Sequence, residues 1–388
     1  MGVKNLLQNK KRPEKRRSRA PLPSFSIVVP VKNEERVVGR LLEALDRLDY
    51  PKDKKEVIIV EDGSSDTTLE VCRRYSEQHR DFAMKIISKS DSKGKPAALN
   101  YGIKQATGDI IAIFDADNVP ASNVLLNVCK YFEDPNIAAV QGRTTPINAG
   151  ENMLTRFAAY EDLVWYEVYM RGKDALNLFV HLRGSCQFIK RAVLSELSGF
   201  DAHMLCEDME LSARLAEKGY CIRYAPDAVS LQESPAHLSQ LVKQRTRWFR
   251  GTMEVAFKYG RLLAKPSARR IDAEATLFGP FILIFSILAY SMAFCSFFLP
   301  LKMDLLLQTI IQFTGASATL TLLACGLALI YATKPRRLKS VFWLVFIYLY
   351  WFFQAFVAVY AFLHILFRRP RKWVKTEKTG VMKLVETA

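Results

Sequence analysis

The sequence predicts an α/β domain with a parallel sheet, followed by a region of membrane-spanning helices. The N-terminal part alternates short apolar runs with amphipathic stretches, which is typical of a β–α–β–α series. The C-terminal part holds three uncharged, largely apolar stretches, at residues 277–299, 305–331 and 341–367. Each is long enough to cross a bilayer, because a helical span needs about 20 apolar residues.

The first strands and helices follow from periodicity and from capping signals. Residues 25–31 form an uncharged apolar run that is typical of a buried strand, and residues 34–48 have the spacing of an amphipathic helix. Residues 56–60 predict a second strand, after which Asp66 can cap the next helix. A third strand is expected at residues 84–88.

The next helix is expected to begin near Pro96, because proline suits a first helical turn. A fourth strand then runs into Asp115. Strands that alternate with helices in this way form parallel sheets with right-handed crossovers.

Carboxylates follow three of these strands. Asp115 and Asp117 end the fourth, while Glu34 and Asp62 follow the first and second. Ligands of parallel sheets bind at the carboxyl ends of the strands, so the Asp pair could meet a hard divalent cation or a sugar nucleotide. Glu34 and Asp62 could accept hydrogen bonds from a base and a ribose. A solvated turn for the Asp pair and helix capping near the other two are the alternatives.

Two later segments carry further candidates. Glu207 and Asp208 open a helical segment, where acidic residues suit the helix dipole or could provide a general base. Gln244, Arg247 and Trp248 share one helix face and offer an amide, a guanidinium for diphosphate oxygens and an indole for a sugar ring. A basic helix on a membrane surface is the alternative.

Two weaker signals remain. Lys95 follows Gly94 close to the expected diphosphate, although a solvated loop lysine fits as well. Residues 183–187 predict a tight turn that could line an acceptor pocket or only connect two strands.

The charge distribution indicates a membrane rather than nucleic acid. The net charge is +16, and the internal basic clusters lie beside the hydrophobic stretches, where positive-inside topology and anionic lipid headgroups explain them. The seven cysteines show no CxxC pattern, which fits reduced thiols. The first apolar run is too short for a signal sequence, so the first domain is expected in the cytoplasm. Three full spans would place the basic residues 368–378 outside, so either one stretch is re-entrant or the charge rule fails here.

Five motifs follow one another along the chain: Pro30-x-x-Asn33-Glu34, Glu61-Asp62-Gly63-Ser64, Asp115-Ala116-Asp117, Glu207-Asp208 and Gln244-x-x-Arg247-Trp248. Taken in this order, they resemble glycosyltransferase family 2, most closely its membrane-embedded branch of cellulose, chitin, hyaluronan and poly-N-acetylglucosamine synthases. The likeness covers about residues 24 to 260 and implies a GT-A fold, a nucleotide-diphospho-sugar donor, Mg²⁺ or Mn²⁺, and inversion at the anomeric carbon.

The resemblance also implies roles for single residues. Asp208 would be the general base with Glu207 beside it, and Asp115 and Asp117 would hold the metal. The nucleotide-sugar contacts would be Pro30, Glu34, Asp62, Lys95, Asp115 and Ala116, and the donor and acceptor clamp would be Gln244, Arg247 and Trp248.

Three departures from the family pattern stand out. Glu61 replaces a common Asp, and Cys206 stands where many polymerising members have Thr, which affects a contact to the acceptor. The N-terminal membrane helices of many polymer synthases are missing, so one copy has little material to enclose a polymer channel.

These observations predict a membrane-bound inverting glycosyltransferase that adds sugar, expected from a UDP-sugar, to a growing polysaccharide. Transfer to a lipid or lipid-linked acceptor is the alternative, and a homo-oligomer or an export partner is left open. The catalytic domain is expected on the cytoplasmic side of the cell membrane. The expected parts are a basic arm (1–23), a GT-A domain (24–260), an interfacial linker (261–276), the membrane region (277–367) and a basic tail (368–388).

Overall fold

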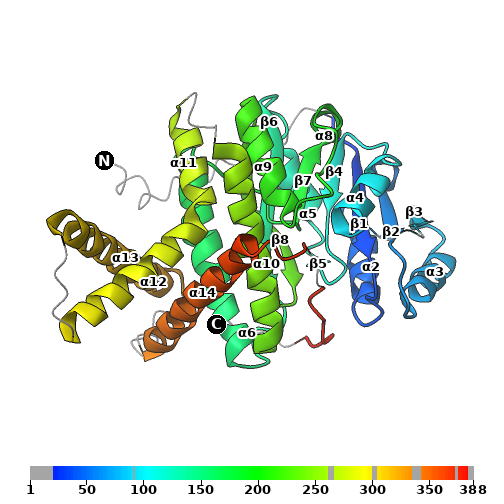
Figure 1. The fold of residues 1–388 in the computed structure, drawn as a ribbon. Coiled ribbons are helices and arrows are strands. Elements are labelled where there is room, and N and C mark those ends of the chain that lie inside the picture. Colours follow the sequence, from blue (N-terminus) through cyan, green and yellow to red (C-terminus); the bar gives the residue numbers. More distant parts are fainter. Residues whose placement is uncertain are drawn as a thin grey trace.

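The computed structural model describes residues 21–89, 91, 93–260, 266–298, 304–333, 342–371 and 375–382. Within these residues, the first domain is built on an eight-stranded sheet with the order β3-β2-β1-β4-β7-β6-β8-β5 (Figure 1). The basic arm at residues 1–20 and the basic cluster at residues 334–339 lie outside the described residues.

The sheet is mixed, and the parallel arrangement predicted for its first four strands is confirmed. The first four strands pair in parallel, but β7 runs antiparallel to both β4 and β6, and β5 runs antiparallel to β8. The strands are β1 (Phe25–Val31), β2 (Lys55–Glu61), β3 (Met84–Ser88), β4 (Ile110–Ile113), β5 (Val119–Pro120), β6 (Ile137–Pro146), β7 (Gln187–Lys190) and β8 (Cys221–Gln232).

Helices cover both faces of the sheet (Figure 1). In chain order they are α2 (Val38–Asp46), the short 3-10 helix η1 (Lys52–Lys54), α3 (Thr68–Gln78), α4 (Lys95–Ile103), α5 (Val124–Cys129), α6 (Met153–Val164), the π-helix η2 (Trp165–Met170), α7 (Arg171–Ala175), α8 (Arg191–Glu196), α9 (Glu207–Lys218), α10 (Leu238–Tyr259) and α11 (Ala268–Leu277).

Two predicted helix starts differ from the structure. The helix expected from Glu34 begins only at Val38, because Asn33 has φ 54° and the Glu34 carbonyl accepts the Val37 and Val38 amides in a turn. Asp66 does accept the Thr68 amide at 3.0 Å, although it stands one residue before the capping position.

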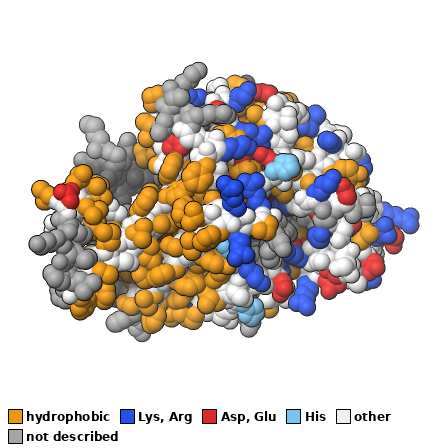
Figure 2. All heavy atoms as spheres, in the orientation of Figure 1, with side chains coloured by type: hydrophobic (Ala, Val, Ile, Leu, Met, Phe, Trp, Pro, Cys, Tyr) orange, Lys and Arg blue, Asp and Glu red, His pale blue; other side chains and the backbone are white. Residues whose placement is uncertain are grey.

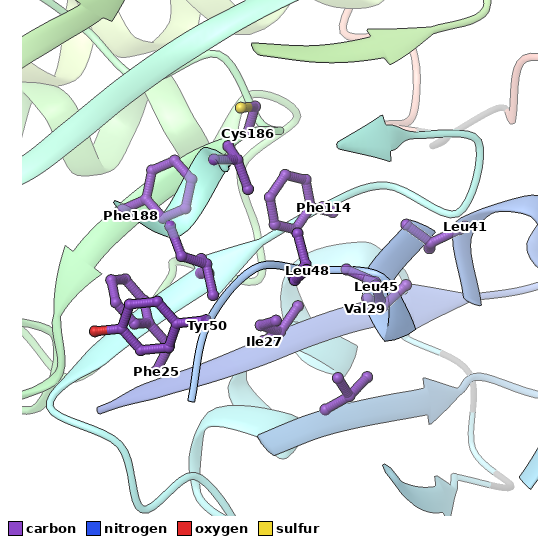
Figure 3. Close-up of a cluster of buried hydrophobic side chains, with 14 of the residues drawn as sticks. Phe25, Ile27, Val29, Leu41, Leu45, Leu48, Tyr50, Phe114, Cys186 and Phe188 are labelled. Atoms are coloured by element: carbon purple, nitrogen blue, oxygen red, sulfur yellow. The ribbon is translucent and has the colours of Figure 1, made fainter. Parts of the chain in front are cut away.

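The core explains why the strands read as uninterrupted apolar runs. Along β1, Ile27 and Val29 pack into one buried cluster while Val28 packs into the cluster on the opposite face. Figure 3 shows Ile27 and Val29 on the face that is covered by Leu41 and Leu45 of α2. Because side chains alternate between the two faces of a strand, a sheet buried on both sides needs apolar residues at every position.

Three further helices are long and apolar enough to cross a membrane: α12 (Gly279–Phe298), α13 (Leu305–Ala332) and α14 (Phe342–Leu366). Their outer faces expose large apolar side chains, which form the orange surface in Figure 2. Phe278 follows the last residue of α11 and precedes the first residue of α12. Ala358 of α14 packs with Met253 and Ala256 of α10, so the apolar helices rest directly on the first domain.

Candidate active site

The carboxyl ends of β1, β2 and β4 lie side by side and carry the predicted polar loops. Hydrogen bonds connect the first two loops, because Asn33 Oδ1 accepts the Ser65 amide at 2.7 Å and Ser64 Oγ accepts the Asn33 amide at 3.1 Å. The amide of Asp62 donates to the Val31 carbonyl at 3.0 Å. The buried Asp62 carboxylate lies 4.0 Å from the Lys89 ammonium. The order of the strands therefore brings together the loops after β1 and β2, which are predicted to bind the nucleoside.

Lys95 connects the metal-motif loop, which carries Asp115 and Asp117 after β4, with the first turn of α9. Its Nζ lies 2.6 Å from Asp115 Oδ1 and 3.8 Å from Glu207 Oε1, and it donates to the Gly184 carbonyl at 2.9 Å. The Lys95 side chain is only 15% exposed, which rejects the alternative of a solvated loop lysine. The second Asp115 oxygen accepts from Gln232 Nε2 at 3.2 Å.

The predicted base stands at the start of α9. Asp208 Oδ1 accepts the Met209 amide at 2.8 Å, and Oδ2 faces Gly184, where an added Cβ would lie 3.3 Å away. Burial raises the pKa of Asp208, and the charges of Lys95 and Arg247 partly oppose the increase. Burial also raises the pKa of the neighbouring Glu207. Raised basicity suits a carboxylate that takes a proton from a hydroxyl group.

The C-terminal segment returns from α14 and covers the second metal-motif carboxylate. Lys378 Nζ lies 2.6 Å from Asp117 Oδ2 and donates to the Glu233 carbonyl at 3.0 Å. Glu233, which follows β8, also accepts the amides of Thr379 and Gly380 at 2.9 and 3.1 Å. In Figure 1 the red segment runs beside β5 and β8. Residues 375–382 therefore contact the candidate metal loop directly.

A second lysine of this segment, Lys375, pairs with the Glu34 carboxylate in the loop after β1. Lys375 Nζ lies 3.0 Å from Glu34 Oε1 and also donates to the carbonyls of Lys32 and Asn33. Burial raises the pKa of Glu34 to about 7, and the Lys375 charge opposes that rise. The segment thus places one ammonium group on each of two predicted ligand-binding carboxylates, Glu34 and Asp117.

The clamp residues lie on α10, which is fixed to α9. The Cys206 thiol lies 3.7 Å from the Trp248 carbonyl, and a Cβ at Gly251 would overlap its Sγ. Further along, Glu210 accepts from Tyr259 Oη at 2.5 Å and pairs with Lys258 at 2.9 Å. The predicted base and the predicted clamp therefore lie on two helices, α9 and α10, that contact each other at two separate points.

The structure brings most of the predicted residues to one edge of the sheet. Pro30 lies in β1 beside Val60, Ala116 is buried between the two Asp residues, and Gln244, Arg247 and Trp248 share one turn of α10. Sequence reasoning did not identify the additional polar residues that complete the cluster, which are Arg40, Gln232, Glu233, Lys375 and Lys378. They follow no local motif, so only the fold reveals them.

The carboxylates fit a divalent metal that also binds phosphate. No three His, Cys, Asp or Glu side chains converge on one point within the residues that the structure describes. Mg²⁺ and similar hard cations are commonly held by one or two carboxylates together with substrate phosphates and water, so a protein site of this size suffices. Lys95 and Lys378 already place cationic groups on Asp115 and Asp117, which indicates that both carboxylates attract positive charge.

Comparisons with known proteins find matches over most of this chain. Residues 23–251 match a family model described as glycosyltransferase like family 2. The "Probable glycosyltransferase YdaM" of Bacillus subtilis is 31% identical over 379 residues, which cover 94% of this chain and 89% of the relative.

A second relative is named for a lipid acceptor. The β-monoglucosyldiacylglycerol synthase of Trichormus variabilis is 32% identical over 246 residues, 63% of this chain, and the match spans about half (52%) of that relative. A solved structure, the mannosyltransferase PcManGT from Pyrobaculum calidifontis in complex with GDP-Man and Mn²⁺, matches 90% of this chain and 89% of its own, with a TM-score of 0.64 and 24% identity. This last likeness concerns the fold.

Proposed function

This chain belongs to glycosyltransferase family 2, and we propose that it is a membrane-bound, metal-dependent, inverting enzyme that transfers a sugar to a lipid or lipid-linked acceptor. It is a glycosyltransferase of GT-A fold that acts on nucleotide sugars. The observation that carries the proposal is the convergence of Asp115, Glu207 and Asp208 around the Lys95 side chain at the carboxyl edge of the sheet.

In the proposed reaction, Asp208 accepts the proton of an acceptor hydroxyl group. The freed oxygen attacks the anomeric carbon from the face opposite to the diphosphate, and the bond between that carbon and the diphosphate oxygen breaks. The nucleoside diphosphate leaves with the bonding electron pair. Because attack and departure take place on opposite faces, the configuration at the anomeric carbon is inverted. Asp115 and Asp117 would hold Mg²⁺ or Mn²⁺, which would supply positive charge for the leaving diphosphate.

Other side chains of the site bind and orient the substrates. Glu34 and Asp62 are assigned to accept hydrogen bonds from the nucleoside, and Lys95 pairs with Asp115 and Glu207. Arg247 is assigned to the diphosphate, where its charge also favours the ionised form of Asp208.

The position of the clamp favours an acceptor that arrives from the membrane. Helix α10 carries Trp248 and packs against α14, one of the three candidate spans. An acceptor that is anchored in a bilayer would reach Trp248 along this side of the domain. The relative that is named for a glycosylated diacylglycerol supports the same choice.

A growing polysaccharide remains the second candidate. It is favoured by the clamp itself, since the indole of Trp248 provides a flat surface on which a terminal sugar can stack.

The test is a screen of UDP-glucose, UDP-N-acetylglucosamine, UDP-galactose and GDP-mannose, each radiolabelled and given with Mg²⁺ or Mn²⁺ to membranes that contain the chain. A lipid acceptor predicts a label that partitions into organic solvent as a single-sugar product. A water-soluble product of high molecular mass would instead support the polysaccharide. Membranes with the Asp208→Asn variant serve as the control, and no label above that background with any donor would contradict the proposed function.

A further inference from the structure

A chain of polar contacts joins the clamp on α10 to the candidate span α14. Arg245 stacks on Trp248, with its guanidinium carbon 4.5 Å from the ring centre. Its Nη2 donates to Glu161 Oε2 of α6 at 2.5 Å. Glu161 also accepts from Gln354 Nε2 at 2.9 Å and from Tyr350 Oη at 3.2 Å, and both of these residues belong to α14.

The α14 end of these contacts is buried, while the Glu161 side chain is 20% exposed. Gln354 and Tyr350 are 5% and 6% exposed. The ring of Tyr350 packs 5.6 Å from that of Phe157, in a cluster that joins α6, α10, α13 and α14. Hydrogen bonds to a carboxylate are strong where water is scarce, and a donor lost there is not replaced by solvent. The arrangement around Glu161 is therefore well defined, and loss of one donor disturbs the others.

We propose that α14 positions Trp248 for the acceptor, with Gln354 and Glu161 as the residues that transmit the position through Arg245. The proposal rests on the proposed function, in which Trp248 receives the acceptor sugar. Arg245 contacts the indole of Trp248 directly, whereas Asp115 and Asp117 follow β4, so the acceptor KM is expected to change more than the donor KM, to which Arg247 of the same helix also contributes.

The first test needs no substrate. The full chain is labelled with 5-fluorotryptophan in detergent micelles, and the ¹⁹F resonance of Trp248 is assigned with Trp248→Phe. Gln354→Leu, which keeps the side-chain size but removes the donor, should move or broaden that resonance, and Glu161→Gln should do the same. The control is Tyr290→Phe, which removes the 2.9 Å hydrogen bond to Thr319 between α12 and α13 and should leave the Trp248 resonance in place.

The second test separates positioning from general damage. The probes are the donor identified in the membrane screen, with dioleoylglycerol and chitotetraose as acceptors. Gln354→Leu should raise the acceptor KM about tenfold, as expected for one hydrogen bond to a charged group, while the donor KM changes much less and the slow hydrolysis of donor by water is retained.

An unmoved Trp248 resonance in folded Gln354→Leu and Glu161→Gln would overturn the proposal. Equal losses of transfer and hydrolysis would overturn it too, because they indicate general damage. If the wild-type enzyme transfers sugar to neither acceptor, the lipid and polysaccharide assignments fail for these probes, and the fluorine resonance alone decides whether α14 positions Trp248.

Discussion

Replacing Lys378 by Met is expected to increase the affinity of the free enzyme for Mn²⁺. The Lys378 ammonium lies 2.6 Å from Asp117 Oδ2, an oxygen of a carboxylate that is assigned to the metal, so the C-terminal segment and a cation compete for the same group. The segment is also held by the Thr379 and Gly380 amides on Glu233. A metal must therefore displace Lys378 before it can bind Asp117.

The size of the effect follows from the contacts that are lost. A hydrogen bond to a charged group contributes about 1.5–3 kcal/mol. If Lys378 favours the docked segment by about 2 kcal/mol, only about 3% of the molecules present a free Asp117, and the apparent Kd for Mn²⁺ is about 30-fold weaker than the intrinsic value. Lys378→Met should recover about 10- to 30-fold in affinity.

Electron paramagnetic resonance measures this directly, because it counts free Mn²⁺ during a titration of the purified chain without donor. Lys93→Met is the matched control, since Lys93 is an exposed lysine that pairs with the exposed Asp91. Asp117→Asn should remove most of the binding and so identify the site. Unchanged or weaker Mn²⁺ binding in Lys378→Met would refute the competition.

Three further predictions concern the base, its titration and the packing behind it. Asp208→Asn should lower turnover by about 10²–10⁴-fold while UDP binding, followed by calorimetry, is retained; nearly full turnover would contradict its role as base. Burial raises the pKa of Asp208 and the Lys95 charge opposes this, so Lys95→Met should raise that pKa further. Because a protonated base cannot accept a proton, activity falls below the pKa, and the acidic limb of the pH–rate profile should move to higher pH; a limb at the original pH would argue against the charge effect. Gly251→Ala should lower the free energy of unfolding by about 1–3 kcal/mol, because the new Cβ would overlap Cys206 Sγ. Thermal unfolding measures this loss, and Gly260→Ala, with open space at its Cβ, should show no comparable decrease.

The strand ends and the helix starts of the site could be predicted because their signals are local. The apolar run before Asp115 marks a buried strand, and the acidic pair Glu207 and Asp208 lies where the structure begins α9. The antiparallel direction of β7 could not be predicted in this way, because the composition of a short strand is the same whether it pairs in parallel or antiparallel.

The contacts of the C-terminal segment could not be predicted from local sequence patterns, for a different reason. Lys378 and Asp117 are separated by most of the chain, and a basic run after an apolar helix fits lipid headgroups equally well. Glu161 illustrates the same limit, since its position beside Asp162 in α6 gives no sign that three donors converge on it. Pairing of this kind becomes visible only when the sheet order and the helix packing are known.

The contacts between α9 and α10 define a part of the enzyme that can vary as one unit between related enzymes. Cys206 against Gly251, and Glu210 against Tyr259, make the two helices one packed body that carries Asp208 and leaves the strand loops outside it. A lineage could change its acceptor by substitutions confined to this body while it kept its donor unchanged. Chimaeras of related enzymes should accordingly be joined around α9 and α10 together rather than between them.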